Sequence, residues 1–457
     1  MAWAALCSLA TIPLGQGGCG QDPAGAPPKP PQPIVIGVSL GLTGALDSLT
    51  GPLQNAIRVA EGQVNSLGGL FGRPVEFRIV DDAGDEATVV QKAVSGLIAQ
   101  GAVVVIGPAG SQQVVATQKL AADKKVVMIS PTATSPDLTS NYQPGRDRWF
   151  FRTTPADDLQ GKAVVLFALK GPPGATLGDG GVLDDGGDAG RPAGSFCTNL
   201  ALVNIDNSYG NAMGDVIVSY LKNRGGTITT RAVVPVKRAD NYKVQVDQVI
   251  KSSPQCQALI AYDDVGDQYM LDLTARASEL PPGFIVIGTD GVYTQQFITN
   301  GRVDKSNPNL PTVAEGVYGT NPDTNPPTRE FGDFKNLYNA YFPLPAGSQP
   351  GIYTANVYDA AILAILAIAQ AGSVSDGVKI RDSLFDVSKK GTVFGPAQLA
   401  EALQAIRNGE DIDYKGASGN VDLDDFGNTV SDYIVWKVEN GEFTETPVDR
   451  IRAAEVQ

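Results

Sequence analysis

The sequence predicts an α/β protein of two lobes, each a doubly wound parallel sheet with helices on both faces. Three observations support this prediction. From residue 34 onward, short β-type runs alternate with helical patterns, as expected for strands joined by single crossover helices. The alternation starts again near residue 159, which indicates a second sheet. The chain has 457 residues, 42% of them hydrophobic, and is long enough for two or three domains with separate cores.

The first lobe is expected to contain four strands separated by helices. Its opening strand, residues 34–39 (IVIGVS), is apolar and β-branched, and a glycine-rich turn follows it. The helix predicted over residues 53–67 places Ile57, Ala60 and Val64 on one side, as packing against a sheet requires. The other expected elements are the strands 75–80, 102–106 and 126–129 and the helices 87–100 and 112–124.

The second lobe repeats this arrangement. We expect helices over 159–169, 211–223 and 244–252, and strands over 200–205, 228–234, 258–262 and 284–287. Further on, the apolar stretch 360–371 is shorter than the roughly 20 residues that a membrane-spanning helix needs. It therefore predicts a buried helix in a packed domain.

The N-terminus has the pattern of an export signal. Residues 2–14 form a short, largely apolar run, and Cys19 follows two glycines and precedes a proline-rich tether. Residues 1–33 are therefore expected to be a signal and tether, with Cys19 as the lipidated residue of a lipoprotein. Gln16 stands where leucine is usual, and no Lys or Arg precedes Lys29. An ordinary signal peptide with a free cysteine, or a misassigned start codon, is the alternative.

Residues 171–194 form a segment dense in Gly, Pro and Asp, which predicts a surface insertion in the second lobe. Asp179, Asp184, Asp185 and Asp188 raise the alternative of a calcium loop. Their spacing does not match the twelve-residue calcium loop, and no glutamate stands at its end. We therefore expect no metal site here.

Two further cysteines, Cys197 and Cys256, each lie just before a predicted strand, the first and third of the second lobe. In a doubly wound sheet of order 2-1-3 these strands are neighbours, so the cysteines would sit side by side at the amino ends of the strands. Outside the cytoplasm a disulfide is expected, and two buried free thiols are the alternative.

Composition excludes several function classes. The net charge is −14 and no cluster of Lys or Arg occurs, so a nucleic-acid partner is not expected. The absence of histidine removes Ser-His-Asp and Cys-His catalysis and the commonest zinc sites. Gly37, Gly41 and Gly44 lack the G-x-G-x-x-G spacing, and no G-K-[ST] occurs, which disfavours nucleotide binding. We expect no cofactor.

Ligands of open parallel sheets bind just beyond the carboxyl ends of the strands. In the first lobe these ends carry glycines and hydroxyls, with Ser111 placed to cap the helix that follows and a hydroxyl-rich segment at 130–135. The free N–H groups and dipole of that helix favour a carboxylate. In the second lobe Asp263, Asp264 and Asp290 suit a cation. Together the two sides predict a ligand that carries both a carboxylate and an ammonium group.

A series of short motifs runs in order along the chain. They are IVIGVSLGLTG (34–44), NSLGGLFG (65–72), VDD (80–82), VIGPAGS (105–111), MISPTATSPDLT (128–139), FFRTTPADDLQG (150–161), NSYG (207–210) and FGN (426–428). With this series the chain resembles the leucine/isoleucine/valine-binding protein family, the type I periplasmic binding proteins of ABC importers, from about residue 34 to its C-terminus.

The resemblance implies a three-strand hinge, which the chain crosses near residues 154, 318 and 431. Lobe 1 would then consist of residues 34–154 and 319–430. Lobe 2 would consist of residues 155–318 and 431–457, including a strand over 433–438.

The resemblance also implies roles for residues at matching positions. Ser111, Thr132 and Thr134, with Ala133 between the two threonines, would hold the α-carboxylate and ammonium of the ligand. Tyr209 would close over the ligand from the second lobe, and Asp290 would meet the ammonium.

Two features depart from the family pattern. The loop 46–50 lacks the aromatic residue that the family often places against the ligand side chain. Asp263 and Asp264 occupy a turn that is often aromatic or glycine-rich in the family. Both features make a polar or cationic ligand side chain, near Asp264, an alternative to a branched one.

The resemblance leads us to expect an extracytoplasmic, lipid-anchored and monomeric receptor that binds an amino acid or similar small polar ligand. It would close its lobes over the ligand and deliver it to an ABC permease. A receptor that signals to a membrane partner is the alternative. An enzyme using Asp263, Asp264 or Asp290 as a general acid–base pair is not expected, because no nucleophile, metal site or cofactor motif accompanies them.

Overall fold

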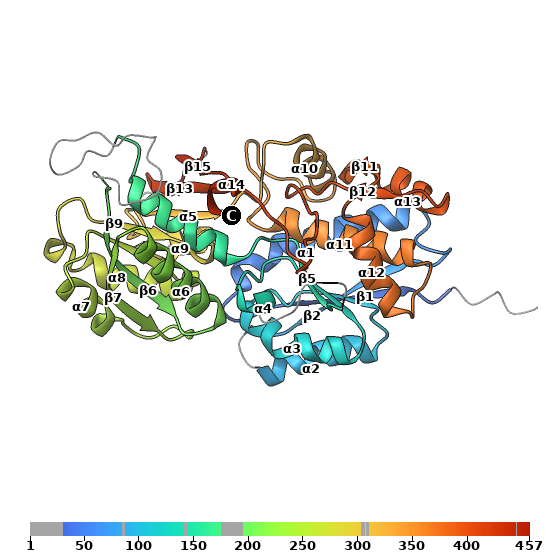
Figure 1. Ribbon diagram of the computed structural model, residues 1–457, viewed down its shortest axis with the longest axis horizontal. Coiled ribbons are helices and arrows are strands. Elements are labelled where there is room, and N and C mark those ends of the chain that lie inside the picture. Colours follow the sequence, from blue (N-terminus) through green and yellow to red (C-terminus); the bar gives the residue numbers. More distant parts are fainter. Residues whose placement is uncertain are drawn as a thin grey trace, which may run out of the picture.

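The computed structural model describes residues 31–84, 87–140, 145, 147–174, 195–302, 307, 310–444 and 446–457. Two main sheets lie in separate halves of the molecule, and helices pack against each of them (Figure 1). The predicted lipidation site Cys19 and most of the predicted insertion, residues 175–194, lie outside the described residues.

The first sheet, as far as the chain is described, has five parallel strands in the order β2-β1-β3-β4-β5. The strands are β1 (Ile34–Leu40), β2 (Val75–Asp81), β3 (Val104–Ile106), β4 (Val127–Ser130) and β5 (Phe150–Arg152). Strand β1 is buried along its whole length, which explains its unbroken apolar sequence. The sequence analysis did not predict β5, because three residues are too few to show a periodic pattern.

Helices cover both faces of this sheet. On one face α2 packs against α3, and on the other α1 packs against α11, which in turn contacts α12 (Figure 1). The bounds of the helices in this half are α1 (Asp47–Ser66), α2 (Ala87–Ala99), α3 (Ser111–Asp123), α4 (Asp137–Ser140), α10 (Arg329–Tyr341), α11 (Thr354–Ala371), α12 (Gly377–Val387), η3 (Pro396–Gln398) and α13 (Leu399–Arg407). A small parallel pair, β11 (Thr392–Phe394) and β12 (Ile412–Tyr414), completes it.

Helix α1 begins six residues earlier than predicted, at Asp47 rather than residue 53. The sequence predicts a later start because Gly51 and Pro52 weaken a helix. In the structure Pro52 lies inside the helix, and the burial of Thr50 and Leu53 accompanies it. Tertiary packing therefore outweighs local propensity at this helix start.

The second sheet, within the described residues, has the order β14-β13-β10-β9-β8-β6-β7, with β15 paired to β13. The strands β7, β6, β8, β9 and β10 are parallel, while β13, β14 and β15 are antiparallel to their neighbours. Their bounds are β6 (Asn199–Ile205), β7 (Thr227–Val234), β8 (Cys256–Ile260), β9 (Ile285–Gly288), β10 (Tyr318–Pro322), β13 (Tyr433–Glu439), β14 (Glu442–Phe443) and β15 (Asp449–Ile451).

The helices of the second half follow the same doubly wound rule. Helix α5 packs against α6 and α14, while α8 packs against α7 and α9. Right-handed crossovers place α6 on the face opposite to α7 and α8, because the chain reverses its direction across the sheet after β7. The bounds are α5 (Asp157–Lys170), α6 (Ser208–Asn223), α7 (Lys243–Lys251), α8 (Asp263–Thr274), η1 (Ala277–Glu279), η2 (Asp290–Val292), α9 (Gln295–Asn300) and α14 (Ala453–Val456).

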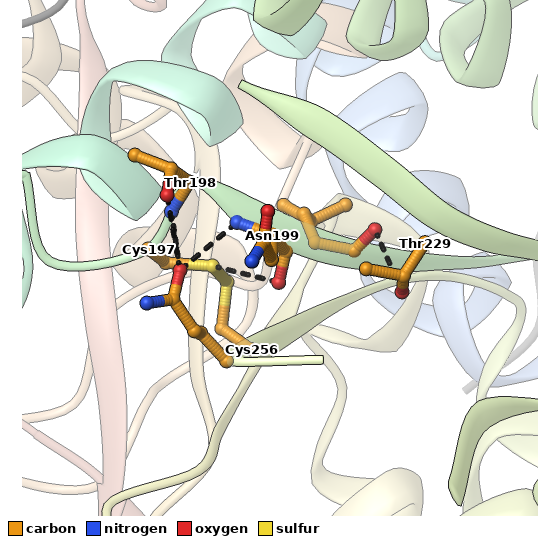
Figure 2. Close-up of a disulfide and its surroundings, with 7 residues drawn as sticks. Cys197, Thr198, Asn199, Thr229 and Cys256 are labelled. Carbon is orange, nitrogen blue, oxygen red and sulfur yellow. Dashed lines mark hydrogen bonds between the residues drawn. A yellow bond between two sulfur atoms is a disulfide. The ribbon is translucent and has the colours of Figure 1, made fainter. Parts of the chain in front are cut away.

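The predicted disulfide between Cys197 and Cys256 is confirmed, with a Cα–Cα distance of 6.0 Å. Figure 2 shows the bond beside the amino end of β6. Strands β6 and β8 are hydrogen-bonded neighbours, and Leu200 pairs with Cys256 in their register. The strand order 2-1-3 that predicts the disulfide is therefore the order that the sheet adopts.

Three segments connect the two sheets, which agrees with a three-strand hinge. They run from β5 to α5, from β10 to α10, and from the segment after β12 to β13. The predicted boundary between residues 318 and 319 falls inside β10, whose residues pair with β9 and β13 of the second sheet. The chain therefore leaves this sheet after Pro322, a few residues later than expected.

Helix α11 is long and apolar enough to span a membrane by length and composition, but 83% of it is buried inside the fold. It contacts α1, α12 and α13 and the strands β3 and β4. This burial confirms the prediction of a core helix over residues 360–371.

Candidate functional site

The carboxyl ends of strands from both sheets meet at one cavity. The space between the atoms that line it, part of which is open to solvent, is about 340 Å³. Its lining consists of Leu46, Leu49, Ala109, Ser111, Thr132, Thr134, Tyr209, Tyr262, Asp290 and Tyr353. Five of the seven predicted ligand-binding residues lie together here, whereas Ala133 and Asp264 are not part of this lining.

Ser111 contributes the start of α3 to the cavity. Gly110 is the N-cap and Ser111 is the first helical residue, so the predicted capping role of Ser111 is wrong. Its Oγ instead accepts a hydrogen bond of 3.1 Å from the backbone N–H of Ser135. The first N–H groups of a helix have no intrahelical acceptors, so α3 presents donors and the positive end of its dipole at this wall.

The segment after β4 is held by its own hydroxyl groups. The Thr132 hydroxyl donates to the carbonyl of Ala109 at 2.6 Å, and the Ser130 hydroxyl donates to the carbonyl of Pro108 at 2.6 Å. The backbone N–H of Ala133 donates to Ser130 Oγ at 3.1 Å. These bonds fix the segment against the turn after β3, and they leave Ala133 buried behind the cavity wall.

Asp290 follows β9 and carries the carboxylate of the opposite wall. Its Oδ1 accepts from the hydroxyl of Tyr209 at 2.8 Å, and its Oδ2 accepts from the hydroxyl of Tyr353 at 2.7 Å. Burial raises the pKa of Asp290, and the hydrogen bonds from the two tyrosines oppose this rise. The carboxylate is therefore preorganised, yet it is short of positive charge.

Tyr209 is brought to Asp290 by the first turn of α6. The side chain of Asn207, the N-cap, accepts from the backbone N–H of Gly210 at 2.9 Å, which fixes that turn. The Tyr209 ring stacks on Tyr262 with ring centroids 5.7 Å apart and an interplanar angle of 3°. Its hydroxyl also lies 2.8 Å from the Thr289 hydroxyl. The motif NSYG therefore places a fixed phenol in the cavity wall.

Tyr353 is a site residue that the sequence analysis missed. It stands just before α11 in the left-handed region, with φ of 62°, a conformation that is strained for a residue other than glycine. Because α11 packs on the first sheet and Asp290 belongs to the second half, its hydrogen bond joins the two lobes. The sequence analysis looked for site residues after predicted strands, and Tyr353 instead precedes a helix.

Asp157, the first residue of α5, is a second missed residue beside the cavity. It is fully buried, and neither carboxylate oxygen has a partner with normal hydrogen-bond geometry in the described part of the chain. Burial raises the pKa of Asp157 well above its usual range, and the nearby Asp290 carboxyl raises it further. The hydroxyl of Thr134 and the charge of Arg152 oppose that rise. Asp157 belongs to the motif FFRTTPADDLQG. The sequence analysis gave it no role, because it starts a helix and does not follow a predicted strand.

Asp263 and Asp264 are at the start of α8, and neither lines the cavity. Asp263 is buried and accepts from the Thr294 hydroxyl at 2.8 Å. Burial, followed by the neighbouring Asp263, raises the pKa of Asp264 to about 6. The predicted contact of Asp264 with the ligand therefore has no support from its position in the fold.

The rest of the cavity lining is apolar or aromatic. Leu46 and Leu49 reach it from the start of α1, and Tyr262 and Tyr353 supply the aromatic rings that the loop 46–50 lacks. Asp290 is the charged residue among the lining residues in the described chain, and the tyrosines occupy both of its oxygens. The lining beside Asp290 is therefore mainly apolar and aromatic.

The lobes also touch beside the cavity. The Ser135 hydroxyl donates to the backbone carbonyl of Ser208 at 3.0 Å, and the backbone N–H of Ser208 donates to Gln112 Oε1 at 3.2 Å. Together with the bond from Tyr353 to Asp290, these contacts describe a conformation in which the two halves are closed on each other. Among the described residues, no group of three or more His, Cys, Asp or Glu is arranged to hold a metal ion.

The family model described as periplasmic binding protein matches residues 33–412. The chain belongs to this family. Members are solute-binding receptors, and family membership implies a location outside the cytoplasm. The motif series and the fold with two doubly wound sheets are thus the features of a type I periplasmic binding protein, as the sequence resemblance predicts.

Curated relatives of this periplasmic binding protein include a Leu/Ile/Val-binding protein and a chemotactic substrate-binding protein. The Leu/Ile/Val-binding protein BraC3 of Rhizobium johnstonii is 24% identical over 375 residues, which cover 80% of this chain and 88% of BraC3. The chemotactic signal transduction system substrate-binding protein BasB of Halobacterium salinarum is 24% identical over 420 residues, covering 88% of this chain and 86% of BasB.

Solved structures share the fold of this periplasmic binding protein. The substrate-binding protein LivJ of Streptococcus pneumoniae in complex with isoleucine aligns with a TM-score of 0.67 and 17% identity, over 92% of this chain and 99% of LivJ. A solute-binding protein of Rhodopseudomonas palustris in complex with 3,4-dihydroxybenzoic acid aligns with a TM-score of 0.64 and 19% identity, over 92% and 97%. The same fold thus accommodates ligands with and without an ammonium group.

Proposed function

We propose that the chain is a solute-binding receptor that captures an L-α-amino acid with a small apolar side chain in the cavity between its lobes. The observation that carries this proposal is the charge distribution around the cavity. Asp157 and Asp290 are two buried carboxyl groups close to each other, and Arg152 is the buried guanidinium that acts on Asp157. An α-ammonium beside Asp290 would stabilise the charged forms of these two buried carboxyl groups.

The opposite wall supports recognition of the α-carboxylate by neutral donors. Ser111, Thr132 and Thr134 line it, and the start of α3 adds its free N–H groups. A ligand with a carboxylate and no ammonium, such as a benzoate, would fill this wall but add negative charge near Asp157 and Asp290 without a cation to balance it. The charge distribution therefore favours a zwitterion.

The apolar lining supports a branched or otherwise aliphatic side chain. Leu46, Leu49, Ala109 and Tyr262 surround the remaining space, and burial of an aliphatic side chain there contributes about 1.5–3 kcal/mol. Charge-assisted hydrogen bonds at the ligand head group add roughly 1.5–3 kcal/mol each before the ordering cost is subtracted. We expect a dissociation constant in the micromolar range or below.

Ligand capture would proceed by hinge closure between lobe 1 (34–154 and, with the boundary moved past β10, 323–430) and lobe 2. In this proposal the ligand docks on the neutral wall first, and closure then brings Asp290 and Tyr209 over it. Delivery to an ABC permease is the expected next step, by a receptor that acts as a monomer. The lipid anchor at Cys19 stays a prediction from the sequence.

A sensory role is the second candidate, and one observation favours it. The chain aligns over 88% of its length with a chemotactic substrate-binding protein, at the same identity as with a Leu/Ile/Val-binding protein. Co-purification of the full-length protein from membranes of its own host would separate the two roles. A permease and ATPase support transport, and a chemoreceptor supports sensing.

A binding screen tests the ligand proposal. We expect L-leucine, L-isoleucine or L-valine to raise the melting temperature of the purified protein, and isothermal titration calorimetry to give a one-site isotherm. Benzoate, L-arginine and L-glutamate serve as controls for the missing ammonium and for charged side chains. Stabilisation by benzoate with no response to any amino acid would overturn the proposal.

A further inference from the structure

The buried guanidinium of Arg152 collects the backbone carbonyls of the segment that lines the cavity. Arg152 is the last residue of β5, and its side chain is fully buried. Its Nη1 donates to the carbonyls of Ala133 at 3.3 Å, Thr134 at 2.9 Å and Ser135 at 2.9 Å. Three successive peptide units therefore turn their oxygens toward one cation.

The other two nitrogens of Arg152 are held from elsewhere in the first lobe. Nη2 donates to the Thr139 hydroxyl at 2.9 Å, and Nε donates to Asn428 Oδ1 at 2.7 Å. The backbone N–H of Arg152 also donates to the carbonyl of Gly427 at 3.0 Å. The planar guanidinium is thus fixed in orientation, which is a property that a lysine ammonium does not share.

Peptide geometry determines where the N–H groups of this segment point. In a planar trans peptide, the C=O of one residue and the N–H of the next lie in opposite directions. Because the carbonyl of Ala133 faces Arg152, the N–H of Thr134 faces away from it, and it makes no hydrogen bond within the described chain. By the same rule the N–H of Ser135 points to Ser111 Oγ, which it reaches at 3.1 Å.

We propose that Arg152 is the positioning residue of the ligand-binding segment 132–135. By holding the carbonyls on the buried side, it keeps the N–H of Thr134 and the Ser111 hydroxyl directed at the carboxylate of the ligand. Arg152 is not part of the cavity lining and does not touch the ligand itself. This inference rests on the proposed function, because it assigns a role in the same site.

The charge of Arg152 is available for this role at neutral pH. Burial lowers the pKa of its guanidinium to about 10, and the nearby Asp157 and Asp158 carboxylates oppose that decrease. The residue therefore stays a cation at the neutral pH at which the receptor works.

Arg148 offers a matched control four residues earlier in the chain. It is also a buried arginine of the first lobe, and it also donates to backbone carbonyls, those of Phe426 and Thr139. None of its described bonds goes to the segment 132–135. Replacing either arginine with methionine removes a buried hydrogen-bonding side chain, but only one of the two holds the ligand segment.

The test compares Arg152→Met and Arg148→Met in the full chain, by thermal denaturation and by calorimetric titration with L-leucine. We expect both variants to lose stability, and only Arg152→Met to weaken L-leucine binding, by at least about tenfold. Arg152→Lys keeps the charge, but one ammonium nitrogen cannot also make the bonds of Nε to Asn428 and of Nη2 to Thr139, so its affinity should lie between those of Arg152→Met and the wild type. If Arg152→Met does not fold, Asn428→Ala, which frees Nε only, should weaken binding about threefold.

The outcomes separate this inference from the proposed function. If the wild-type protein binds L-leucine and the folded Arg152 or Asn428 variants bind it equally well, Arg152 has no positioning role. If Arg148→Met weakens binding as much as Arg152→Met, the effect is one of general stability and the inference is overturned. If the wild type binds no amino acid in the screen, the proposed function fails, and this inference fails with it.

Discussion

The two walls of the cavity are built in different ways. On the first-sheet side the polar groups are neutral, and they come from Ser111, Thr132, Thr134 and the start of α3. On the second side the polar groups are the carboxyl of Asp290 and the hydroxyl of Tyr209, and the buried carboxyl of Asp157 lies near both Asp290 and Thr134. The neutral wall is held by hydrogen bonds among its own residues and to Arg152.

This difference shows how one cavity can serve both ends of a zwitterion. Backbone and hydroxyl donors have little desolvation cost when a carboxylate replaces water, so the neutral wall is stable when empty. Buried carboxyl groups are less favourable without a cation, which is why the pKa values of Asp157 and Asp290 are raised. A ligand with a positive charge therefore stabilises the acidic wall more than the neutral wall.

The acidic wall should dominate affinity. Asp290→Asn keeps the size of the side chain and an acceptor for one tyrosine, but it removes the charge that faces the ammonium. We expect binding of L-leucine to weaken by about 2 kcal/mol or more, at least about 30-fold, measured by isothermal titration calorimetry.

Asp264→Asn is the matched control for this measurement. Asp264 is a partly buried carboxyl of the same lobe that does not line the cavity, so its replacement should leave the dissociation constant unchanged. An unchanged constant in Asp290→Asn together with weaker binding in Asp264→Asn would move the ammonium site to the start of α8.

The neutral wall should contribute less, and only to ligands with a carboxylate. Ser111→Ala removes the hydroxyl that faces the cavity and the acceptor for the N–H of Ser135, and we expect about tenfold weaker binding of L-leucine. Binding of 3-methylbutylamine, which has the ammonium and side chain of leucine without its carboxylate, should change little. Equal losses for both compounds in competition titrations would show that Ser111 does not meet the carboxylate.

The acidic wall should also make binding depend on pH. The pKa values of Asp157 and Asp290 are raised in the empty site, and a bound ammonium favours their charged forms. While the amino group of L-leucine stays protonated, affinity should therefore decrease as the pH falls through the raised pKa values, by up to about tenfold per pH unit for each proton. Titrations in buffers with different ionisation heats should detect proton release on binding, and Asp290→Asn should reduce it.

The disulfide lies far from both walls of the cavity. Cys197 and Cys256 lie at the amino ends of their strands, opposite the edge that forms the cavity. Replacing both with alanine should lower the free energy of unfolding by about 4 kcal/mol in the chain-entropy model, given a sequence separation of 59. Affinity for L-leucine should stay within about twofold of the wild type at temperatures where the variant is folded. A large change in affinity would show that the site depends on the stability of the whole lobe.

Much of the fold could be predicted because its signals are local. Buried strands such as β1 and β8 are unbroken apolar runs, and α11 is a long apolar helix, so hydrophobic patterns are enough to find them. The disulfide followed from the strand order of a doubly wound sheet, and the site residues Ser111, Thr132 and Asp290 followed from their places after strands.

The missed residues share a different origin. Tyr353 and Asp157 stand at helix starts that follow no strand predicted from the sequence, whereas the helix start at Ser111 follows a predicted one. A helix start of the first kind has no strong local signal, since it is decided by packing against distant segments. Asp264 follows a strand, as the sequence analysis has it, but it stands in the first turn of α8 and is not part of the cavity lining.

The sequence by itself predicted the two sheets, the order 2-1-3 of the first three strands of the second sheet, the disulfide, and the contrast between a neutral and an acidic set of strand ends. Only the tertiary structure decided that Tyr353 crosses between lobes to Asp290, that Asp157 is buried beside it, and that Arg152 gathers three carbonyls behind the ligand segment. The physical reason is the range of the interactions. Hydrophobic periodicity and turn chemistry act over a few residues, whereas charge balance in a buried cavity depends on groups brought together from both lobes.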